Sequence, residues 1–487
     1  MHELSRELDA VSTGVSMPRY DLRSVNPAIV HIGLGGFFRA HFARYTHDLM
    51  NDAPDALGWG IVGAGLRSTD KKLLAALHRQ QGLYTLVETD LRGETRTLIG
   101  SIVDALDASE RTEALLTEID RPTTRIVSIT VSEHGYHLAS ATRKLDLADT
   151  AVLQDIARPR TPQTMPGILV EGLRRRRQAC RPAFTVMSCD NIQHNGRVLR
   201  DAVLALAGAS DESLKDWIAT HGRFPCSMVD RITPMPTPEQ ISKCAATTGL
   251  GDAASLFTET FRQWVMEDSF ADGRPDWNRV GAQFVSDVGP YEAMKLRLLN
   301  ASHLAIASIG VLSGHSSVLE AISDPLIARY MARLMNEETG PTLRPVPGID
   351  LAAYKSTLID RFANPAIHDP LPRINADAPV NLLLDPIRDR LAASASIDLL
   401  ALGLAAWMVR VRDDALALPA SRPMQQAEAL LQNAVRCSHL HLVDLLAVEE
   451  AFGPIGRDPR LVASIGRCLR AIDEQGVRGT LKRAIEA

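Results

Sequence analysis

Four polar side chains are grouped in a segment that is otherwise rich in leucine and alanine. They are Glu292, Lys295, Asn300 and His303. At about 100° per residue in an α-helix, all four fall within one arc of the helix surface. Polar groups on one face of an apolar helix need one another, or a cavity, as partners. This face is therefore either a site of proton transfer and hydroxyl binding or a purely structural polar network.

A second segment whose residues could bind a ligand is the glycine-rich run that follows the first predicted strand. It consists of Gly33, Leu34, Gly35, Gly36, Phe37, Phe38 and Arg39, and a helix follows it. Glycines allow a tight turn and let a pyrophosphate approach the backbone, whose free N–H groups bind its charge. Phe38 stands where the G-x-G-x-x-G pattern has its third glycine, so the helix is expected to pack less closely on the strand. The position favours dinucleotide binding over a plain strand-to-helix turn.

Asp70 is the first acidic residue after the second predicted strand. In dinucleotide-binding folds an acid near this place binds the ribose hydroxyls of NAD and repels the 2′-phosphate of NADP. Two alternatives stay open. Asp70 could cap the following helix, and the neighbouring Arg67 and Lys71 could instead bind a 2′-phosphate.

Short β-rich runs alternate with helical stretches over the first part of the chain. Strands are predicted at residues 28–32, 59–63, 83–88, 97–104, 126–131 and 184–188, and helices at 38–50 and 70–79. This alternation predicts a parallel sheet covered by helices on both faces. From about residue 291, leucine, alanine and isoleucine recur at helical spacing almost to the C-terminus. We therefore predict an α/β domain over residues 1–285 and a mostly α-helical domain over 286–487.

The overall composition excludes several classes of protein. The 487 residues carry a net charge of −5 with a pI near 6.3, so no basic field is present to bind nucleic acid or an anionic membrane. The most apolar run, residues 399–409, is too short to span a bilayer and is predicted to be a buried helix. Six cysteines without a C-x-x-C pair, and an N-terminus without a secretory pattern, indicate a cytoplasmic protein with reduced thiols.

Two further patterns are set aside. Tyr291 and Lys295 have the spacing of the catalytic pair of short-chain dehydrogenases, but the glycine loop and the large helical second domain do not fit that class. His439 and His441, with Asp444, are a poor metal site because residues two apart on a helix face in different directions. No metal is therefore expected.

Several separated segments resemble the mannitol dehydrogenase family of long-chain polyol dehydrogenases. The glycine loop is similar to that family's loop signature, and Lys295, Asn300 and His303 match its helix signature. Residues 184–191, 228–234 and 346–350 also resemble family segments, and the similarity runs from about residue 17 to the C-terminus. The resemblance implies a Rossmann-type dinucleotide-binding domain joined to a helical domain, with the active site between them. It also implies a metal-independent, NAD-dependent interconversion of a polyol and its ketose.

The resemblance assigns roles to individual residues. Lys295 is the expected general base, and Asn191 and Asn300 are the expected donors to the developing oxyanion. Asn191 also follows a predicted strand, at the end where ligands of open α/β sheets bind. By resemblance, His303 positions the substrate hydroxyls, and Glu292 relays the proton.

Four more residues complete the expected site. Asp230 and Arg373 match substrate contacts of the family, and Glu133 matches a position near the cofactor. Asn381 stands where the family usually has a substrate-contacting lysine, which leaves the preferred sugar open among mannitol, sorbitol and D-arabinitol.

Two other functions are kept as alternatives. One is a hexuronate reductase of the same family, acting on fructuronate or tagaturonate, against which the missing cation at Asn381 argues. The other is a catalytically silent dinucleotide sensor, which would be expected to lack the base or the oxyanion donors. The expected partner is a small polyol or ketose, and the chain is expected to be a monomer or a weak oligomer.

Overall fold

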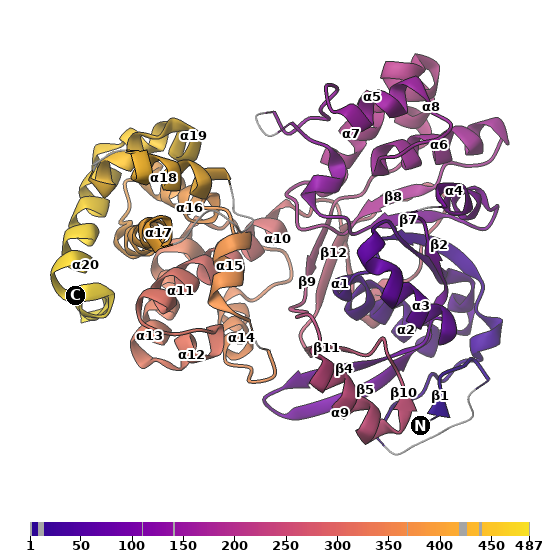
Figure 1. Cartoon of the computed structure of the whole chain (residues 1–487), viewed down its shortest axis with the longest axis horizontal. Helices are drawn as coiled ribbons and strands as arrows, with labels where there is room; N and C mark the ends of the chain where they lie inside the picture. Colours follow the sequence, from indigo (N-terminus) through magenta and orange to yellow (C-terminus); the bar gives the residue numbers. More distant parts are fainter. Residues whose placement is uncertain are drawn as a thin grey trace. The chain divides into compact units, whose positions relative to one another are not determined.

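The computed structural model describes residues 2–7, 14–109, 111–139, 142–367, 369–417, 426–437 and 441–486. The chain divides into two compact units, Met1–Gly289 and Pro290–Ala487, which we call the N-terminal and the C-terminal unit. Figure 1 shows the sheets of the first and the helices of the second.

A five-stranded parallel sheet forms the centre of the N-terminal unit (Figure 1). Its strands lie in the order β6-β3-β2-β7-β8. They are β2 (Pro27–Ile32), β3 (Gly60–Gly65), β6 (Ile102–Asp107), β7 (Ile126–Ile129) and β8 (Thr185–Ser188). From β2 the chain adds β3 and β6 on one side, and it then crosses over to add β7 and β8 on the other. The strand order therefore reverses between β2 and β7, as in doubly wound dinucleotide-binding folds. The predicted Rossmann-type α/β arrangement is confirmed.

Alternate side chains of these strands point into two separate cores. Ile29 and Ile61 pack with α2 (Phe42–Asp52) and α3 (Lys71–Arg79) on one face. Val30 and Val127 pack on the other face with α4 (Thr112–Asp120), α6 (Met165–Gln178) and α7 (Asn195–Ser210). Burial on both faces explains why the strands are almost continuously apolar.

The predicted strands at 83–88 and 97–104 do not both belong to this sheet. β4 (Tyr84–Asp90) and β5 (Gly93–Ile99) form an antiparallel hairpin, and β11 (Leu256–Glu259) adds to β4 in parallel. The run 97–104 is divided between β5 and β6 at Gly100, where a Cβ would lie 2.3 Å from Leu22. A local β-rich pattern does not show which strand a run will pair with, so it could not predict that β5 pairs with β4 and β6 with β3.

The N-terminal unit holds further elements that complete its architecture. A third sheet pairs β9 (Ser227–Asp230), β12 (Gln263–Glu267) and β13 (Gln283–Val285), and β1 (His2–Glu3) pairs with β10 (Leu250–Gly251). The remaining described α-helices of this unit are α1 (Gly36–Ala40), α5 (Thr150–Ala157), α8 (Glu212–His221) and α9 (Pro238–Thr248). The predicted helix 38–50 is interrupted at His41, which separates α1 from α2.

Every described element that begins after residue 289 is helical. The α-helices are α11 (Ala301–Leu312), α12 (Val318–Ser323), α13 (Pro325–Arg333), α14 (Leu351–Phe362), α15 (Leu371–Asp377), α16 (Asn381–Ala392), α17 (Asp398–Ala417), α18 (Gln426–Cys437), α19 (Glu449–Phe452) and α20 (Pro459–Glu486). α10 (Gly289–Met294) begins the unit, and two stretches, η6 (Lys295–Asn300) and η7 (Leu334–Thr339), are π-helical. α11 is buried almost all round and packs against α15 and α17.

The apolar run 399–409 lies inside α17 and is buried, as predicted. Within the described part of the chain, no helix combines the length and the apolar character that crossing a membrane requires.

Candidate active site

The glycine loop begins at a backbone position that only glycine can occupy. Gly33 has a φ of +107°, and a Cβ there would lie 2.1 Å from the carbonyl oxygen of Thr130. The carbonyl of Gly33 accepts hydrogen bonds from His31 Nε2 at 2.9 Å and from Thr130 Oγ1 at 2.8 Å. Burial lowers the pKa of His31 to about 3, so the ring is neutral and donates one proton. The loop is thereby fixed between the ends of β2 and β7, where the sheet order reverses.

The next part of the loop leaves open space beside the backbone. Gly35 caps the N-terminus of α1 without a side-chain hydrogen bond, and a Cβ on it would meet no atom within 4 Å. The first N–H groups of a helix have no partner within the helix. A phosphate fits such a place, because it needs donors and close access to the backbone. Gly36 follows, while Leu34 fills the space over Gly63.

The aromatic residues and the arginine of this segment point inward. Phe38 is fully buried and its ring stacks on His31, with centroids 3.6 Å apart and planes 7° apart. The ring fills the gap between helix and strand at the place of the missing glycine. Arg39 is 4% exposed and donates through Nη1 to the carbonyl of Ala254 at 2.5 Å. Phe37 stacks on His41. The side chains of Phe38 and Arg39 are thus structural. Because the Arg39 N–H donates to the carbonyl of Gly35 at 3.3 Å, the N–H groups that remain for a cofactor are those at the very start of α1.

Asp70 lies just beyond the end of β3, in a short turn that leads into α3. Its carboxylate accepts from the Arg67 backbone N–H at 3.3 Å and from the Arg67 guanidinium at 3.0 Å. It makes no side-chain cap to α3 itself. The carboxylate is mostly covered, whereas the Arg67 side chain is 75% exposed. The alternative in which Asp70 caps the following helix is therefore not realised, and ribose binding stays a prediction.

The predicted residues of the N-terminal unit gather at one edge of the parallel sheet. The glycine loop follows β2, Asp70 follows β3, Glu133 follows β7 and Asn191 follows β8. Because the strands are parallel, these four chain segments leave the sheet at the same edge. Asn191 and Glu133 are exposed, and Glu133 lies 3.6 Å from Arg143.

Asp230 is the last residue of β9 and is 3% exposed. Its neighbour Arg231 is a buried cation that holds several elements together. Arg231 donates to the carbonyls of Ala40, at the end of α1, and of Glu259, and pairs with the Glu88 carboxylate on β4. The chain at Asp230 is therefore anchored to the helix that follows the glycine loop.

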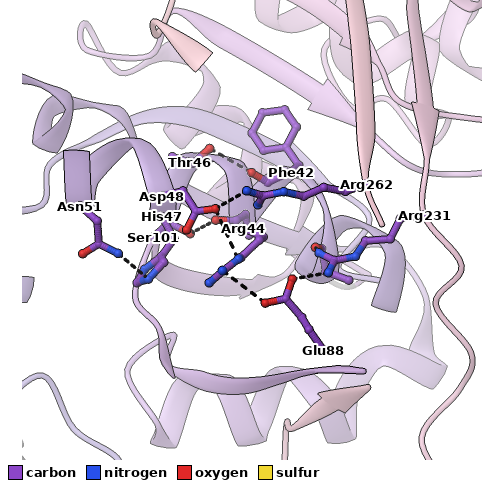
Figure 2. A network of polar contacts seen from close by, with 12 residues as sticks. Phe42, Arg44, Thr46, His47, Asp48, Asn51, Glu88, Ser101, Arg231 and Arg262 are labelled. Carbon is purple, nitrogen blue, oxygen red and sulfur yellow. Dashed lines mark hydrogen bonds and ion pairs between the residues drawn. The ribbon is translucent and has the colours of Figure 1, made fainter. Parts of the chain in front are cut away.

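Figure 2 shows how this anchor continues into a chain of ion pairs. Arg44 bridges Glu88 at 3.3 Å and Asp48 at 3.4 Å, and Asp48 also pairs with Arg262 at 2.6 Å. Burial is the main cause that lowers the pKa of Arg231, and the Glu88 carboxylate opposes that shift. Sequence reasoning missed this network, because its members come from four distant segments of the chain.

In the C-terminal unit, Lys295 and Asn300 stand at the two ends of the π-helical turn η6. The backbone N–H of Ala301 donates to the carbonyl of Leu296, five residues earlier. Residues five apart are therefore nearly aligned along the helix axis, so Asn300 lies one turn above Lys295. The expectation of a regular α-helix was wrong here, and the extra residue brings this pair closer to alignment than 100° steps allow. Lys295 and Glu292 are 9% and 5% exposed.

Contacts outside the helix hold this turn in place. The Tyr291 hydroxyl donates to the carbonyl of Pro347 at 2.7 Å. Arg297 donates to the carbonyl of Thr342 and pairs with Asp389 of α16 at 2.6 Å. The His303 ring contacts the Phe362 ring, with centroids 4.7 Å apart.

The remaining predicted residues lie on neighbouring helices of the same unit. Arg373, on α15, is half exposed and donates to Asp369 at 2.6 and 3.0 Å. Asn381 is the exposed first residue of α16. Both helices pack against α11. Asn300 Oδ1 is a buried oxygen for which no hydrogen-bond partner exists among the described residues, an arrangement that suits a ligand hydroxyl.

His439 lies outside the described residues. In the described ranges, no three His, Cys, Asp or Glu side chains come close enough to hold a metal ion.

The doubly wound sheet, the glycine loop at its switch point and the buried lysine of a following helical unit are features of a Rossmann-fold oxidoreductase. Residues 27–279 match the mannitol dehydrogenase Rossmann domain, and residues 287–473 match the mannitol dehydrogenase C-terminal domain. The chain belongs to the mannitol dehydrogenase family, as its sequence resemblance implied.

Three relatives illustrate the range of this similarity. The structure of mannitol 2-dehydrogenase from Pseudomonas fluorescens, in a ternary complex with NAD and D-mannitol, is 40% identical, covers 100% of both chains and has a TM-score of 0.88. D-mannonate oxidoreductase of Escherichia coli is 43% identical over 81% of this chain and 82% of that protein. Polyol:NADP oxidoreductase of Gluconobacter oxydans is 40% identical over 84% of this chain and 86% of that protein.

Proposed function

We propose that this protein is a metal-independent, NAD-dependent oxidoreductase that interconverts a polyol, of mannitol, sorbitol or D-arabinitol type, and its ketose. The observation that carries the proposal is the buried Lys295 with Asn300 one π-turn above it. Within a family of polyol dehydrogenases, this pair offers a proton acceptor and a hydrogen-bond donor or acceptor on one helix face.

The glycine loop is the proposed site of the cofactor pyrophosphate. The open space at Gly35 and the free N–H groups at the start of α1 support this assignment. Asp70, beyond the end of β3, is proposed to accept hydrogen bonds from the adenosine ribose, which favours NAD over NADP. Once bound, the nicotinamide ring supplies the acceptor for the hydride of the carbinol carbon.

The chain's own residues take up the hydroxyl proton and stabilise the negative charge that develops on the hydroxyl oxygen. Lys295 Nζ takes the proton of the hydroxyl that is oxidised, and Glu292, three residues earlier on the helix, relays that proton towards solvent. The Asn191 and Asn300 amides donate to the same oxygen as negative charge develops on it. With Nδ2 of Asn300 so engaged, its buried Oδ1 is left to accept from a neighbouring substrate hydroxyl.

Three more side chains are proposed to select the substrate. His303, Asp230 and Arg373 offer both donors and acceptors, which suits a chain of hydroxyl groups. A pocket built for hydroxyls rejects analogues that lack them, because buried polar groups are then left unpaired.

A second candidate is a hexuronate reductase that forms an aldonate such as D-mannonate. The similarity to D-mannonate oxidoreductase of Escherichia coli favours it. Two features oppose it. A carboxylate substrate calls for an additional cation, whereas Asn381 is neutral and Arg373 already pairs with Asp369.

A substrate panel tests the proposal. Mannitol, sorbitol, D-arabinitol and D-mannonate are each assayed with NAD and with NADP by the absorbance of the reduced nicotinamide, before and after exhaustive chelation. We expect polyol oxidation with NAD that chelation leaves unchanged, because the lysine replaces a Lewis acid. A kcat/KM higher for D-mannonate than for every polyol would establish the second candidate instead. Activity that is lost on chelation and restored by zinc would overturn the lysine mechanism.

A further inference from the structure

Asp190 is a buried carboxylate immediately before Asn191. The residue is 9% exposed, and each carboxylate oxygen has a defined donor. Oδ1 accepts from the Ser132 backbone N–H at 2.8 Å, and Oδ2 accepts from the Tyr136 hydroxyl at 2.9 Å. Burial raises the pKa of Asp190, while the backbone donor opposes that shift.

The backbone of Asp190 is held as firmly as its side chain. Its N–H donates to Ser188 Oγ at 3.2 Å, and Ser188 Oγ lies 2.5 Å from the Tyr136 hydroxyl. Its carbonyl accepts from Asn195 Nδ2 at 3.0 Å and from the Ile192 N–H at 2.9 Å. Every polar group of Asp190 is therefore engaged, which fixes the turn on both sides of Asn191.

The same contacts reach the neighbouring strand ends. Asn195 Nδ2 donates to the carbonyl of Ser227 at 2.8 Å, and the Ser227 N–H returns a bond to Asn195 Oδ1 at 3.0 Å. Ser227 Oγ donates to the carbonyl of Ser188 at 2.6 Å. Ser227 begins β9, the strand that ends at Asp230. One polar cluster thus joins the chain after β7, the end of β8 and the start of β9.

A cluster of this kind is costly unless it is fully satisfied, and a satisfied one specifies a single geometry. Asn191 follows Asp190 directly and is exposed, so the position of its backbone is set by this turn. A donor to an oxyanion must lie at a defined distance, and a shift of about 1 Å can reduce the rate roughly 100-fold.

We infer that Asp190 is a positioning residue for the reaction: it fixes the turn that carries Asn191, so that this amide points at the oxygen of the substrate. The inference rests on the proposed function, in which Asn191 is an oxyanion donor. In this role Asp190 acts through its neighbour Asn191 and not on the substrate itself.

A double-mutant cycle separates positioning from a general structural role. Asp190→Ala, Asn191→Ala and the double variant are compared by kcat/KM for the best polyol, by NADH affinity and by melting temperature. We expect Asp190→Ala to lower kcat/KM roughly 10- to 100-fold. In the Asn191→Ala background, Asp190→Ala should lower kcat/KM by less than about threefold, because the amide that Asp190 positions is already absent. NADH affinity should stay within about threefold of wild type.

Conservative and control variants complete the design. Asp190→Asn retains an acceptor for Ser132, and the Tyr136 hydroxyl can turn to donate to Ser188, so most activity should be rescued. Asp155→Ala is the matched control, since Asp155 is also a buried carboxylate that accepts backbone N–H bonds, from Gln163 and Thr164. It should lower the melting temperature while leaving kcat/KM unchanged.

The possible outcomes are distinct. Equal losses from Asp190→Ala in both backgrounds would overturn the inference, as would a parallel loss of NADH affinity. If Asp190→Ala does not fold, Tyr136→Phe removes one donor to the carboxylate and should show a smaller loss with the same coupling. Full activity of Asn191→Ala alone would instead refute the role of Asn191 in the proposed function.

Discussion

At the scale of single residues, Lys295 combines a titratable amine with almost complete burial. The residue is only 9% exposed. In the proposed mechanism, the position of Lys295 on the π turn, next to Asn300 along the axis, places an amide where charge develops when an alcohol is deprotonated. The two side chains are therefore the pair whose replacement should be most informative.

Lys295→Ala should nearly abolish turnover and leave NADH binding intact. Loss of a general base typically lowers the rate roughly 100- to 10,000-fold, whereas the cofactor contacts proposed here belong to the other unit. Steady-state rates and fluorescence titration with NADH measure the two quantities. Lys482→Ala, at a largely exposed lysine of the same unit, serves as the control and should behave as wild type. Near-normal activity of Lys295→Ala would remove this lysine from the mechanism.

Asn381→Lys should shift substrate choice towards mannitol. Asn381 is exposed at the start of α16, and a longer, charged side chain there could reach a hydroxyl at the far end of a six-carbon chain. One added hydrogen bond is worth about 1 kcal/mol, so the kcat/KM ratio of mannitol to D-arabinitol should rise about fivefold. Asn381→Met controls for length without charge. If the wild type is already strongly selective for mannitol and Asn381→Lys changes nothing, this position plays no part in specificity.

At the scale of elements, the glycine loop contains two glycines with different physical requirements. Gly33 is needed by the fold, since its positive φ and its contact with Thr130 leave no room for a Cβ. Gly35 has an ordinary φ of −64° and open space around it, so the fold makes no demand on it. Any need for glycine at position 35 must then come from a ligand.

Gly33→Ala should therefore affect stability, and Gly35→Ala should affect cofactor binding. Gly33→Ala should destabilise the N-terminal unit by about 1–3 kcal/mol or more, seen as a lower melting temperature. Gly35→Ala should melt as wild type but bind NADH more weakly, because its methyl group occupies room that a pyrophosphate needs. Unchanged NADH affinity of Gly35→Ala would mean that the pyrophosphate does not lie against this glycine.

A comparison of the predicted helices and strands with the observed ones shows how much of the structure the sequence could predict. Four of the five parallel strands and the C-terminal helices follow from local apolar patterns, whereas β6 was predicted only in part. The site residues of the helix were found because they share one face. The π turn was not foreseen, because residues 295–300 contain neither proline nor glycine and fit an α-helical period equally well. The cluster around Asp190 and the ion pairs of Arg231 were missed for a related reason. The residues that form these contacts are distant from one another in sequence, so no local spacing predicts the contacts.

At the scale of the whole molecule, the N-terminal unit should lose stability in acid. Three histidines of the N-terminal unit, His31, His41 and His47, are fully buried. Burial lowers the pKa of His31 and His41 to about 3 and that of His47 well below its usual value. In the unfolded chain the same side chains take up protons near pH 6.5. Between these limits the unfolded state binds more protons than the folded one.

The free energy of unfolding of the N-terminal unit should therefore fall as the pH drops below about 6.5. Each histidine contributes a slope of up to about 1.4 kcal/mol per pH unit, and its stabilisation is fully present above that range. Urea unfolding followed by tryptophan fluorescence measures the effect, since Trp264 and Trp277 are buried in this unit. His47→Gln should make the dependence shallower. A pH-independent urea midpoint between about pH 7.5 and 5 would contradict the assignment.

The π turn has one consequence that concerns inheritance rather than mechanism. Such a turn is an α-helix that has accepted a single inserted residue. Removing one residue between Lys295 and Asn300 would restore the ordinary ladder, and Asn300 would then follow the lysine by four residues. At about 100° per residue, that spacing keeps Asn300 within about 40° of the lysine, and His303, then seven residues on, within about 20° of it. A one-codon deletion in this helix would therefore keep all three side chains on one face, so a lineage can vary the length of this helix without turning these residues away from one another.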